Sequence, residues 1–576
     1  MNRNNERHFN QIPNIQISRS TFKRDQKIMT TFDAGELVPF YVDEVLPGDT
    51  FRVNTEAIIR QTTPKYPVMD DAYIDFYYFY APNRILWEHW KQFMGEAEET
   101  PWMPTTAYSV PTIKINRAYT SANGPKIPET GTILDYMGVP TQVVDTKTSA
   151  TDSGTFEVNA LPIRAYVMIW NEFFRDQNVE NAAVWNNDDS FKVYVPTTVA
   201  GNPDTIESRL THAIMGSRCL PVNKFHDYFT SCLPYPQRGP EVTLPMSGNA
   251  EVGFYNTAAK AWDGVQYWLG GNGETPPAVS GSASAGNHTW LVSKLMGNTD
   301  AIAYTDKTGN SPRGILTADL STVTAATIND LRQAVAVQHY YEALARGGSR
   351  YREQIRAIWG TTISDKTVQI PEYLGGGRYH VNMNQVVQTS GEAGTDSTPL
   401  GETGAVSITP VRESSFTKSF EEHGFVIGVM CVRHDRTYQQ GLERFWSRSE
   451  RLDYYVPQFA HLGEQPVKKQ EIMLTGKTSD LETFGYQEAW ADYRMKPNRV
   501  SGKMRSNAEG TLDFWHYADD YDTVPTLSQE WMSEGKAEIA RTLIVQNEPQ
   551  FFGGILVRNK TTRPMPLYSV PGLTKL

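Results

Sequence analysis

The sequence predicts a mainly β protein, a β-sandwich that carries large loop and helix insertions. Tyr, Phe and Trp number 29, 24 and 13, and Gly and Pro number 43 and 34. Such aromatic, turn-rich chains favour strands joined by long loops. Strand patterns dominate both ends of the chain, and helical patterns lie between them. A jelly roll of eight strands in two sheets fits this arrangement and needs far fewer than 576 residues, so most of the chain is expected in the connections.

Four segments carry the strand patterns. Residues 36–61 predict two strands around a turn at 47–49, and residues 424–433 and 552–558 predict buried strands. Residues 71–80 alternate with period two, which predicts two different faces. One face holds Tyr73, Asp75, Tyr77 and Phe79, and the other holds Ile74, Phe76, Tyr78 and Tyr80.

Helical periodicity appears at 84–94, 163–177, 328–346 and 350–359. The segment 328–346 opens with a sequence resembling a capping box and is followed by Gly347-Gly348, which predicts its end. Its apolar face holds Leu331, Ala334, Val335, Tyr341, Leu344 and Ala345. We interpret all these apolar stripes as core packing.

Two polar stretches interrupt the strand patterns. Residues 241–315 are rich in Gly, Ser, Pro, Thr and Asn, which predicts a long exposed insertion loop with little core. Residues 388–404 are similar but shorter. Strand patterns resume after each stretch, so we expect a single domain over residues 1–576, with these stretches as loops.

The charge is unevenly distributed along the chain. The whole chain carries −11, whereas residues 1–27 carry +4 and residues 551–576 carry +4, which leaves −19 for the rest. A basic N-terminal arm and a basic C-terminal segment on an acidic body suggest that both ends meet an anionic partner. The alternative is two solvated tails with no partner, and charge alone does not separate the two.

Compartment and targeting are also constrained. The sequence has no run of eighteen apolar residues, so no membrane insertion is expected, and the N-terminal segment lacks the apolar core of a signal peptide. Only Cys219, Cys232 and Cys431 occur, an odd and sparse set that argues against disulfides and fits a reducing cytoplasm.

No motif predicts catalysis, a metal or a cofactor. Thr475-Gly-Lys-Thr478 lacks the first glycine of a phosphate-binding loop, and Gly375–Gly377 is interpreted as a tight turn. The set His212, Cys219, His226 and Cys232 lacks zinc-knuckle spacing, so no metal site is expected. An enzyme is not excluded by these absences, because a glycosidase needs only two carboxylates without a motif.

Blocks spread over almost the whole chain carry a recognisable family pattern. They are NIQISRSTFKRDQKIMTTFDAGELVPFYVDEVLPGDTF (14–51), FYAPNRILWEHWKQFMGE (79–96), LPIRAYVMIWNEFFRDQN (161–178), HDYFTSCLPYPQRG (226–239), LRQAVAVQHYYEALARGGSRYREQI (331–355), PEYLGGG (371–377), SFEEHGFVIGVMCVRHDRTYQQGLERFWSR (419–448), AHLGEQPV (460–467), FGYQEAWADYRMKPNRVSG (484–502) and RPMPLYSVPGL (563–573). In this order, they resemble the major capsid proteins of gokushoviruses, in the family Microviridae.

This resemblance implies an eight-stranded jelly-roll core and a structural protein, not an enzyme, that self-assembles into a small icosahedral T=1 shell. The implied partners are other copies of the chain, a circular single-stranded DNA genome, a scaffolding protein, a DNA pilot protein and a small DNA-associated protein. The implied location is the virion, assembled in the cytoplasm of a host bacterium. Residues 241–315 lie where the family carries a surface insertion that forms a three-fold protrusion, which we expect to meet a host-cell surface receptor.

Two sets of site residues follow as hypotheses. The DNA-contacting candidates are the basic residues of both ends: Arg3, Arg7, Arg19, Lys23, Arg24, Lys27, Arg558, Lys560, Arg563 and Lys575. The anchors of the protrusion are Trp262, Tyr267, Trp268 and Trp290, because a loop without any packing would not need them. The competing functional class is a β-rich enzyme, for instance a carbohydrate-active one with an aromatic cleft, and a paired-carboxylate site would support it.

Overall fold

The computed structural model describes residues 18–96, 107–116, 128–141, 155–194, 205–243, 251–256, 261–263, 314–319, 327–389, 401 and 403–568. The chain forms two compact units: Met1–Arg238 with Glu342–Leu576, and Gly239–Tyr341. Each unit is described by itself.

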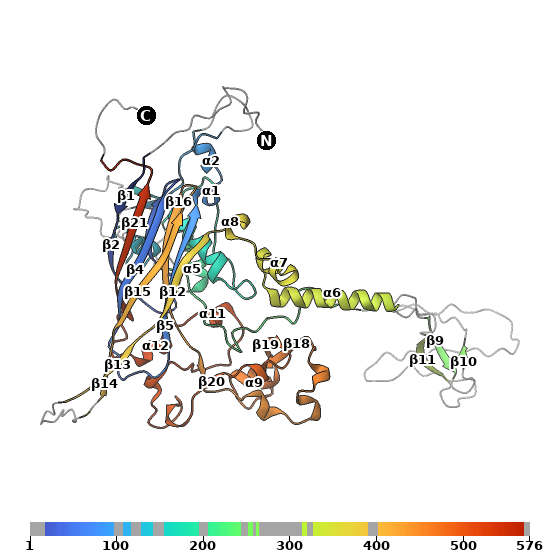
Figure 1. Ribbon diagram of the computed structural model, residues 1–576. Coiled ribbons are helices and arrows are strands. Elements are labelled where there is room, and N and C mark those ends of the chain that lie inside the picture. The colour runs from blue at the N-terminus through green and yellow to red at the C-terminus, as the bar shows by residue number, and fades with distance from the viewer. Residues whose placement is uncertain are drawn as a thin grey trace, which may run out of the picture. The chain divides into compact units, whose positions relative to one another are not determined.

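The first unit contains an antiparallel sheet of five strands (Figure 1). Its members are β1 (Ser20–Lys23), β2 (Gln26–Phe32), β4 (Thr50–Gln61), β15 (Thr409–Ser419) and β21 (Phe551–Arg563). The order is β1-β21-β4-β15, and β2 also pairs with β21. β1 pairs with the end of β21 and β2 with its beginning, so the two short strands together occupy one strand position.

A second antiparallel sheet has four strands in the order β12-β5-β16-β3. They are β3 (Val38–Val45), β5 (Ala72–Pro82), β12 (Glu372–His380) and β16 (Gly424–His434). The two faces predicted for residues 71–80 are confirmed in β5. Ile74, Phe76, Tyr78 and Tyr80 belong to one hydrophobic core and Phe79 to another, which Tyr77 partly covers.

The two sheets share the first of these cores. Phe51, Val53 and Ile555 come from the five-stranded sheet, and Phe76 and Met430 come from the four-stranded sheet. The second core covers the other face of the four-stranded sheet with α4 (Leu161–Ile169) and the π-helical turn Trp170–Phe174. The four-stranded sheet is therefore covered on both faces, whereas many side chains on the outer face of the five-stranded sheet remain exposed.

Apart from α6, which has 20 residues, the remaining elements are short, and they lie mostly in the connections. The α-helices are α1 (Asn83–Leu86), α2 (Trp90–Phe93), α3 (Ile133–Tyr136), α5 (Ile206–His212), α6 (Ile328–Gly347), α7 (Tyr351–Trp359), α8 (Asp365–Val368), α9 (Lys469–Ile472), α10 (Ala491–Arg494), α11 (Gln529–Met532) and α12 (Ala537–Thr542). The minor strands of the first unit are β6 (Thr112–Asn116), β7 (Thr155–Asn159), β8 (Lys192–Val193), β13 (Met383–Val387), β14 (Thr403–Ser407), β17 (Thr437–Tyr438), β18 (Glu464–Lys468), β19 (Thr483–Glu488) and β20 (Asn498–Arg499). Short 3-10 turns lie at Ala213–Met215, Arg444–Ser447, Arg451–Asp453, Pro457–Phe459, Thr478–Leu481, Gly502–Met504 and Asp513–Trp515.

Several sequence predictions are confirmed and others are corrected. The mainly β class, the strands at 36–61, 71–80 and 424–433 and the helix at 328–346 are all present. Residues 552–558 form a strand, as predicted, within β21, but the strand is buried on only one face, because Phe552 and Arg558 are exposed on its outer face. Gly375–Gly377 lies in β12 and not in the predicted tight turn. Glycine is needed at position 376 because a side chain there would collide with the Phe76 carbonyl of β5.

The interpretation of the α6 and α7 stripes as core packing is also wrong. Leu331 and Val335 of α6 and Trp359 of α7 are exposed, and of α6 only Ala345 is buried. The periodicity predicted the helices correctly, but it cannot tell which surface an apolar face meets.

The second unit contains a three-stranded antiparallel sheet of β9 (Glu251–Asn256), β10 (Ala261–Asp263) and β11 (Gly314–Asp319), in the order β10-β9-β11. The backbone of Trp262 pairs with that of Tyr255 in this sheet. The predicted anchors Tyr267, Trp268 and Trp290 lie outside the described residues. In the described part of the chain, no helix has the length and apolar character that crossing a bilayer requires.

Candidate nucleic-acid interface

The exposed face of the five-stranded sheet is strongly basic. Alternate residues of its strands point outward, as the period of two requires. The outward-pointing acidic residue in the described strands is Glu56. The outward-pointing cations are Lys23, Lys27, Arg52, Arg60, Arg412, Arg558 and Lys560. We call this set, together with Glu56, the basic sheet face. Its net charge is +6 in a chain whose total charge is −11.

Three of these cations form one row across the sheet. Lys23 of β1 is paired in register with Lys560 of β21, which is paired in turn with Arg52 of β4. Like charges directly opposite each other on neighbouring strands are destabilising. Lys23 lies 3.3 Å from the Asp25 carboxylate, but among the described residues no carboxylate lies within ion-pair distance of Arg52 or Lys560, so these two keep their positive charge available to an anion.

The rest of the basic sheet face combines partial neutralisation with apolar surface. Glu56 accepts a hydrogen bond of 2.9 Å from Arg558 and lies 3.7 Å from Arg412. Met29, Ile58 and Phe552 are exposed beside these charges. Cations for phosphates next to apolar and aromatic groups for bases are the combination found in sequence-independent binding sites for single-stranded nucleic acid.

A broad depression of about 1350 Å³ adjoins this face along β2. Lys27 and Arg60 of the basic sheet face also line this depression, and so does Phe552, which is exposed beside that face. Lys536 adds a further cation to the lining, and it is paired with Asp33 at 3.3 Å. Beyond the sheet the lining holds three cations, Arg209, Arg218 and Lys536, and three carboxylates, Asp33, Glu36 and Asp135, so the excess of positive charge is confined to the sheet face.

The structure separates the predicted DNA-contacting residues into different groups. Lys23, Lys27, Arg558 and Lys560 lie on the basic sheet face, and Arg19 is exposed beside Gly48. Arg3, Arg7 and Lys575 lie outside the described residues.

The other two candidates have partners inside the protein. Arg24 donates a hydrogen bond of 2.5 Å to Asp43, and Arg563 donates one of 3.0 Å to Asp49, which is fully buried. Burial and pairing of this kind stabilise the sandwich edge and leave these two guanidinium groups less available to a phosphate.

Sequence reasoning missed Arg52, Arg60 and Arg412. A signal was available for the first two, because they occupy alternate positions of the strand 50–61 together with Glu56 and Ile58. Arg412 joins the face only because β15 pairs with β4 from a distant part of the chain.

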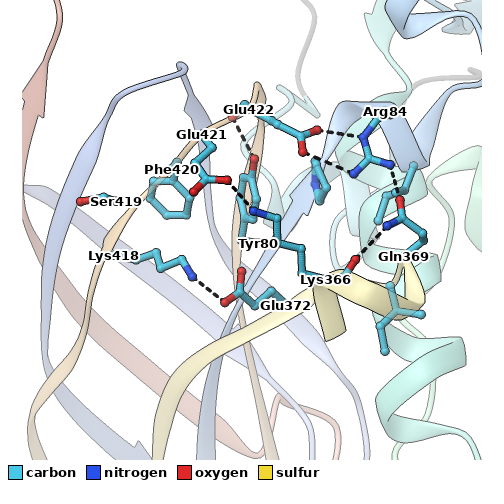
Figure 2. A pocket seen from close by; sticks show the side chains of 13 residues that line it. Tyr80, Arg84, Lys366, Gln369, Glu372, Lys418, Ser419, Phe420, Glu421 and Glu422 are labelled. Carbon is cyan, nitrogen blue, oxygen red and sulfur yellow. Dashed lines mark hydrogen bonds and ion pairs between the residues drawn. The ribbon is translucent and has the colours of Figure 1, made fainter. Parts of the chain in front are cut away.

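The competing hypothesis of a glycosidase-like site is tested by a pocket between α8 and the residues that follow β15 (Figure 2). Its three carboxylates are each paired with a cation: Glu372 with Lys418, Glu421 with Lys366, and Glu422 with Arg84. The cavity volume is about 70 Å³, well below the roughly 300–1,000 Å³ of ordinary ligand pockets. This pocket therefore does not supply the acid and nucleophile that glycoside cleavage requires.

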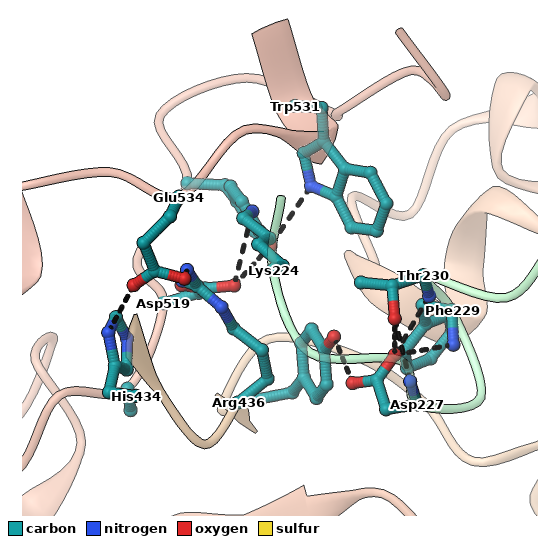
Figure 3. Close-up of polar contacts among 12 residues, drawn as sticks. Lys224, Asp227, Phe229, Thr230, His434, Arg436, Asp519, Trp531 and Glu534 are labelled. Carbon is teal, nitrogen blue, oxygen red and sulfur yellow. Dashed lines mark hydrogen bonds and ion pairs between the residues drawn. The ribbon is translucent and has the colours of Figure 1, made fainter. Parts of the chain in front are cut away.

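A second cluster of charged groups is buried beside the end of β16 (Figure 3). Arg436 donates to Asp519 at 2.7 Å and also to Glu534, His434 lies 2.6 Å from Glu534, and Lys224 lies 3.9 Å from Asp519. We call these five residues the buried ionic cluster. Burial, the largest single effect, would raise the pKa values of both carboxyl groups. Arg436 and the other groups around them, Lys224 and the Tyr521 hydroxyl at Asp519 and His434 at Glu534, together outweigh it and lower each pKa to about 2.

Perturbed titratable groups often mark active sites, but this cluster is inaccessible to a substrate. The side chains of Arg436, Asp519 and Glu534 are at most 1% exposed. They join three separate chain segments, namely the residues after β16, the stretch before Tyr521 and the end of α11. The cluster is therefore a structural connection.

The predicted absence of disulfides agrees with the structure, in which Cys219, Cys232 and Cys431 are free and buried. Among the described residues, no group of three or more His, Cys, Asp or Glu side chains is arranged to hold a metal ion.

Comparisons with known proteins agree with a non-enzymatic role. The family model described as capsid protein (F protein) matches residues 10–573. The chain belongs to this capsid protein family.

Individual relatives give the same result over the full length. The capsid protein VP1 of Bdellovibrio phage phiMH2K is 38% identical, that of Chlamydia phage 1 is 36% identical, and that of Spiroplasma virus 4 is 35% identical. Each match covers 99% of this chain and 98% of the relative. The resemblance to gokushovirus capsid proteins of the Microviridae is confirmed, and the protein is a structural component of a virion whose shell is built from many copies.

Proposed function

We propose that this capsid protein forms a T=1 icosahedral shell around a circular single-stranded DNA genome, with the basic sheet face directed inward. The observation that carries the proposal is the row of cations Lys23, Lys560 and Arg52, whose like charges lie in register on neighbouring strands. This row belongs to the basic sheet face, which has a net charge of +6. Phosphate groups would relieve this repulsion and release their own counterions on binding.

The strand order supports a jelly roll as the shell-forming core. If β1 and β2 count as one strand, the two sheets hold eight strand positions. Numbered along the chain, these positions run 1-8-3-6 in one sheet and 2-7-4-5 in the other, so most successive strands alternate between sheets. Closed shells are commonly built from jelly rolls, because their two-sheet core leaves the loops free to form contacts between subunits.

The exposed cations of the sheet refine the earlier hypothesis about the chain ends. Lys23, Lys27, Arg558 and Lys560 remain proposed DNA contacts, joined by Arg52, Arg60 and Arg412. The basic terminal residues Arg3, Arg7 and Lys575 remain proposed contacts on the ground of charge alone.

Electron microscopy of the assembled particle tests this proposal directly. We expect a closed shell in which the five-stranded sheet forms the inner wall and density for nucleic acid touches the basic sheet face. A particle with this sheet on its outer surface would overturn the assignment.

The other proposed partners follow from the family resemblance. They are a scaffolding protein, a DNA pilot protein and a small DNA-associated protein, with assembly in the cytoplasm of the host bacterium. We also propose that the insertion 241–315 forms a protrusion at the three-fold axes and meets a host-cell surface receptor. The separation of Gly239–Tyr341 as a compact unit supports an insertion that is distinct from the core.

Exchanging residues 241–315 for the insertion of a relative is expected to change which bacterial hosts adsorb the particle, while the shell still assembles. Limited proteolysis of intact particles should cut first in this region, for example after Lys294, Lys307 or Arg313, since an exposed tip is accessible to protease. Adsorption assays on both hosts and peptide mapping provide the measurements. Loss of assembly with unchanged adsorption in the surviving particles would assign the segment a structural role instead.

A further inference from the structure

An exposed group of aromatic side chains lies in the connections between β17 and β20. Its members are Phe445, Trp446, Tyr454, Tyr455 and Tyr493, and we call them the aromatic patch. All five are exposed, and Trp446 is exposed by 67%. A soluble protein rarely leaves several large rings together in water, so such a patch marks an interaction surface.

Cations and hydrogen bonds fix the position of one half of the patch. The guanidinium group of Arg448 lies 4.3 Å from the ring centre of Tyr493 and 5.7 Å from that of Tyr454. Asp492 holds Arg448 through an ion pair. The rings of Tyr455 and Tyr493 lie 6.2 Å apart, and the Tyr493 hydroxyl accepts a hydrogen bond of 3.5 Å from the backbone N–H of Tyr455.

The other half is fixed in the same way. The rings of Phe445 and Trp446 lie 4.7 Å apart, and the Lys496 ammonium group lies 5.2 Å from the centre of the Phe445 ring. Glu443 pairs with Lys496 at 2.9 Å and with Arg499 at 3.3 Å. The rings are thus held in place before any partner binds, which lowers the entropy cost of association.

The charge around the patch distinguishes between possible partners. Residues 443–499 contain nine Lys or Arg and nine Asp or Glu, so this segment is neutral in a chain that carries −11. Arg448 and Lys496 are already paired with carboxylates, unlike Arg52 and Lys560 on the basic sheet face. The patch therefore fits a protein surface better than a nucleic acid. Its neutrality also lets two copies of an acidic chain approach here without repulsion.

We propose that the aromatic patch is a contact between copies of this chain, and that a neighbouring copy covers Trp446 and Tyr493 in the shell. This inference rests on the proposed function, in which many copies close into one particle. Aromatic residues and arginine are enriched at the centres of protein interfaces, where few side chains provide most of the binding free energy.

The test uses the accessibility of a single introduced thiol, Trp446→Cys, in the full-length chain. The three native cysteines are buried, so the new thiol is the reactive one in the folded protein. We expect rapid maleimide labelling in unassembled subunits, labelling at least about tenfold slower in particles made in a complementing host, and recovery after the particles are dissociated. Equal labelling rates in subunits and intact particles would overturn the proposal. Slow labelling already in the subunit would also overturn it, because the chain itself would then cover the patch.

A photo-crosslinking amino acid at position 446 identifies the covering molecule. An adduct between two copies of the chain supports the proposal, whereas an adduct only with nucleic acid or with another viral protein contradicts it. If the unmodified chain forms no closed shells, the proposed function fails. If shells form and the thiol introduced by Trp446→Cys stays reactive in them, only this inference fails.

A matched pair of substitutions separates the patch from exposed tryptophan in general. Trp446→Ser is expected to reduce particle yield at least about tenfold, because tryptophan is enriched among the interface residues that contribute most to binding. Trp359→Ser is the control, because Trp359 is exposed by 69% but lies on α7, outside the patch. Circular dichroism of both subunits checks folding. An equal loss of yield from both substitutions would refute the specific role of the patch.

Discussion

Replacing Lys23, Arg52 and Lys560 together with glutamine is expected to weaken the binding of single-stranded DNA to purified subunits at least about tenfold at low salt. These residues form the row of cations in register across β1, β21 and β4. Each contact with a phosphate releases bound counterions, so three lost contacts should reduce the slope of log K against log salt concentration by about 2. Fluorescence anisotropy with a labelled oligonucleotide over a series of salt concentrations measures both quantities.

A second triple variant controls for net charge. Lys65, Lys477 and Lys503 are exposed and lie outside the basic sheet face, so their replacement by glutamine changes the charge of the chain by the same amount. We expect this control to keep most of the affinity and slope. Equal weakening in both variants would mean that only the total charge matters. The row variant should also keep or raise its thermal stability, since it removes repulsion between like charges on neighbouring strands.

Substituting Arg436 with methionine is expected to destabilise the subunit by about 3–5 kcal/mol near neutral pH. Arg436 is fully buried and is the shared partner of Asp519 and Glu534, which would lose the guanidinium group between them and keep only the more distant Lys224 and the His434 ring as neighbours. Chemical denaturation of the unassembled subunit measures the change. Arg499→Met is the control, since Arg499 is 71% exposed and its ion pair with Glu443 should be worth less than about 1 kcal/mol.

The pH dependence identifies the cause of this loss. In the native protein, the pKa values of Asp519 and Glu534 are about 2, below their values of about 4 in an unfolded chain. Their contribution to stability is therefore complete above about pH 4 and is lost as the pH falls towards 2. Without Arg436, burial raises both pKa values, so the stability difference between Arg436→Met and the natural protein should narrow as the pH falls. A difference that stays constant with pH would indicate lost packing and not uncompensated charge. Adding Asp519→Asn and Glu534→Gln to Arg436→Met should recover part of the stability.

Local sequence patterns predicted individual elements well. The alternation in 71–80 gave the two faces of β5 because neighbouring side chains in a strand point to opposite sides. The periodicity of 328–346, with Gly347-Gly348 at its end, gave α6 for a similarly local reason. The same reasoning failed for the environment of α6, because the exposure of Leu331 depends on what the rest of the chain places beside it.

The candidate site shows the same division. Lys23, Lys27, Arg558 and Lys560 were identified from clustered charge at the two ends of the chain. Their arrangement in one face was not predictable, because it requires β1 and β21, more than five hundred residues apart, to pair in a particular register. The same pairing turned Arg563 inward to Asp49 and so separated it from its neighbours in the sequence.

The sequence by itself determined the family, the mainly β class, the basic character of both ends and most of the major strands and helices. These properties depend on composition, on local periodicity and on blocks that extend over almost the whole chain. Only the tertiary structure decided which cations share a surface, which are paired inside the protein, and that Arg448 and Lys496 contact the exposed rings of Tyr493 and Phe445. Burial, cross-strand register and contacts between distant segments are set by long-range packing. Residues far apart in the chain must be brought together before their charges and rings act as one surface.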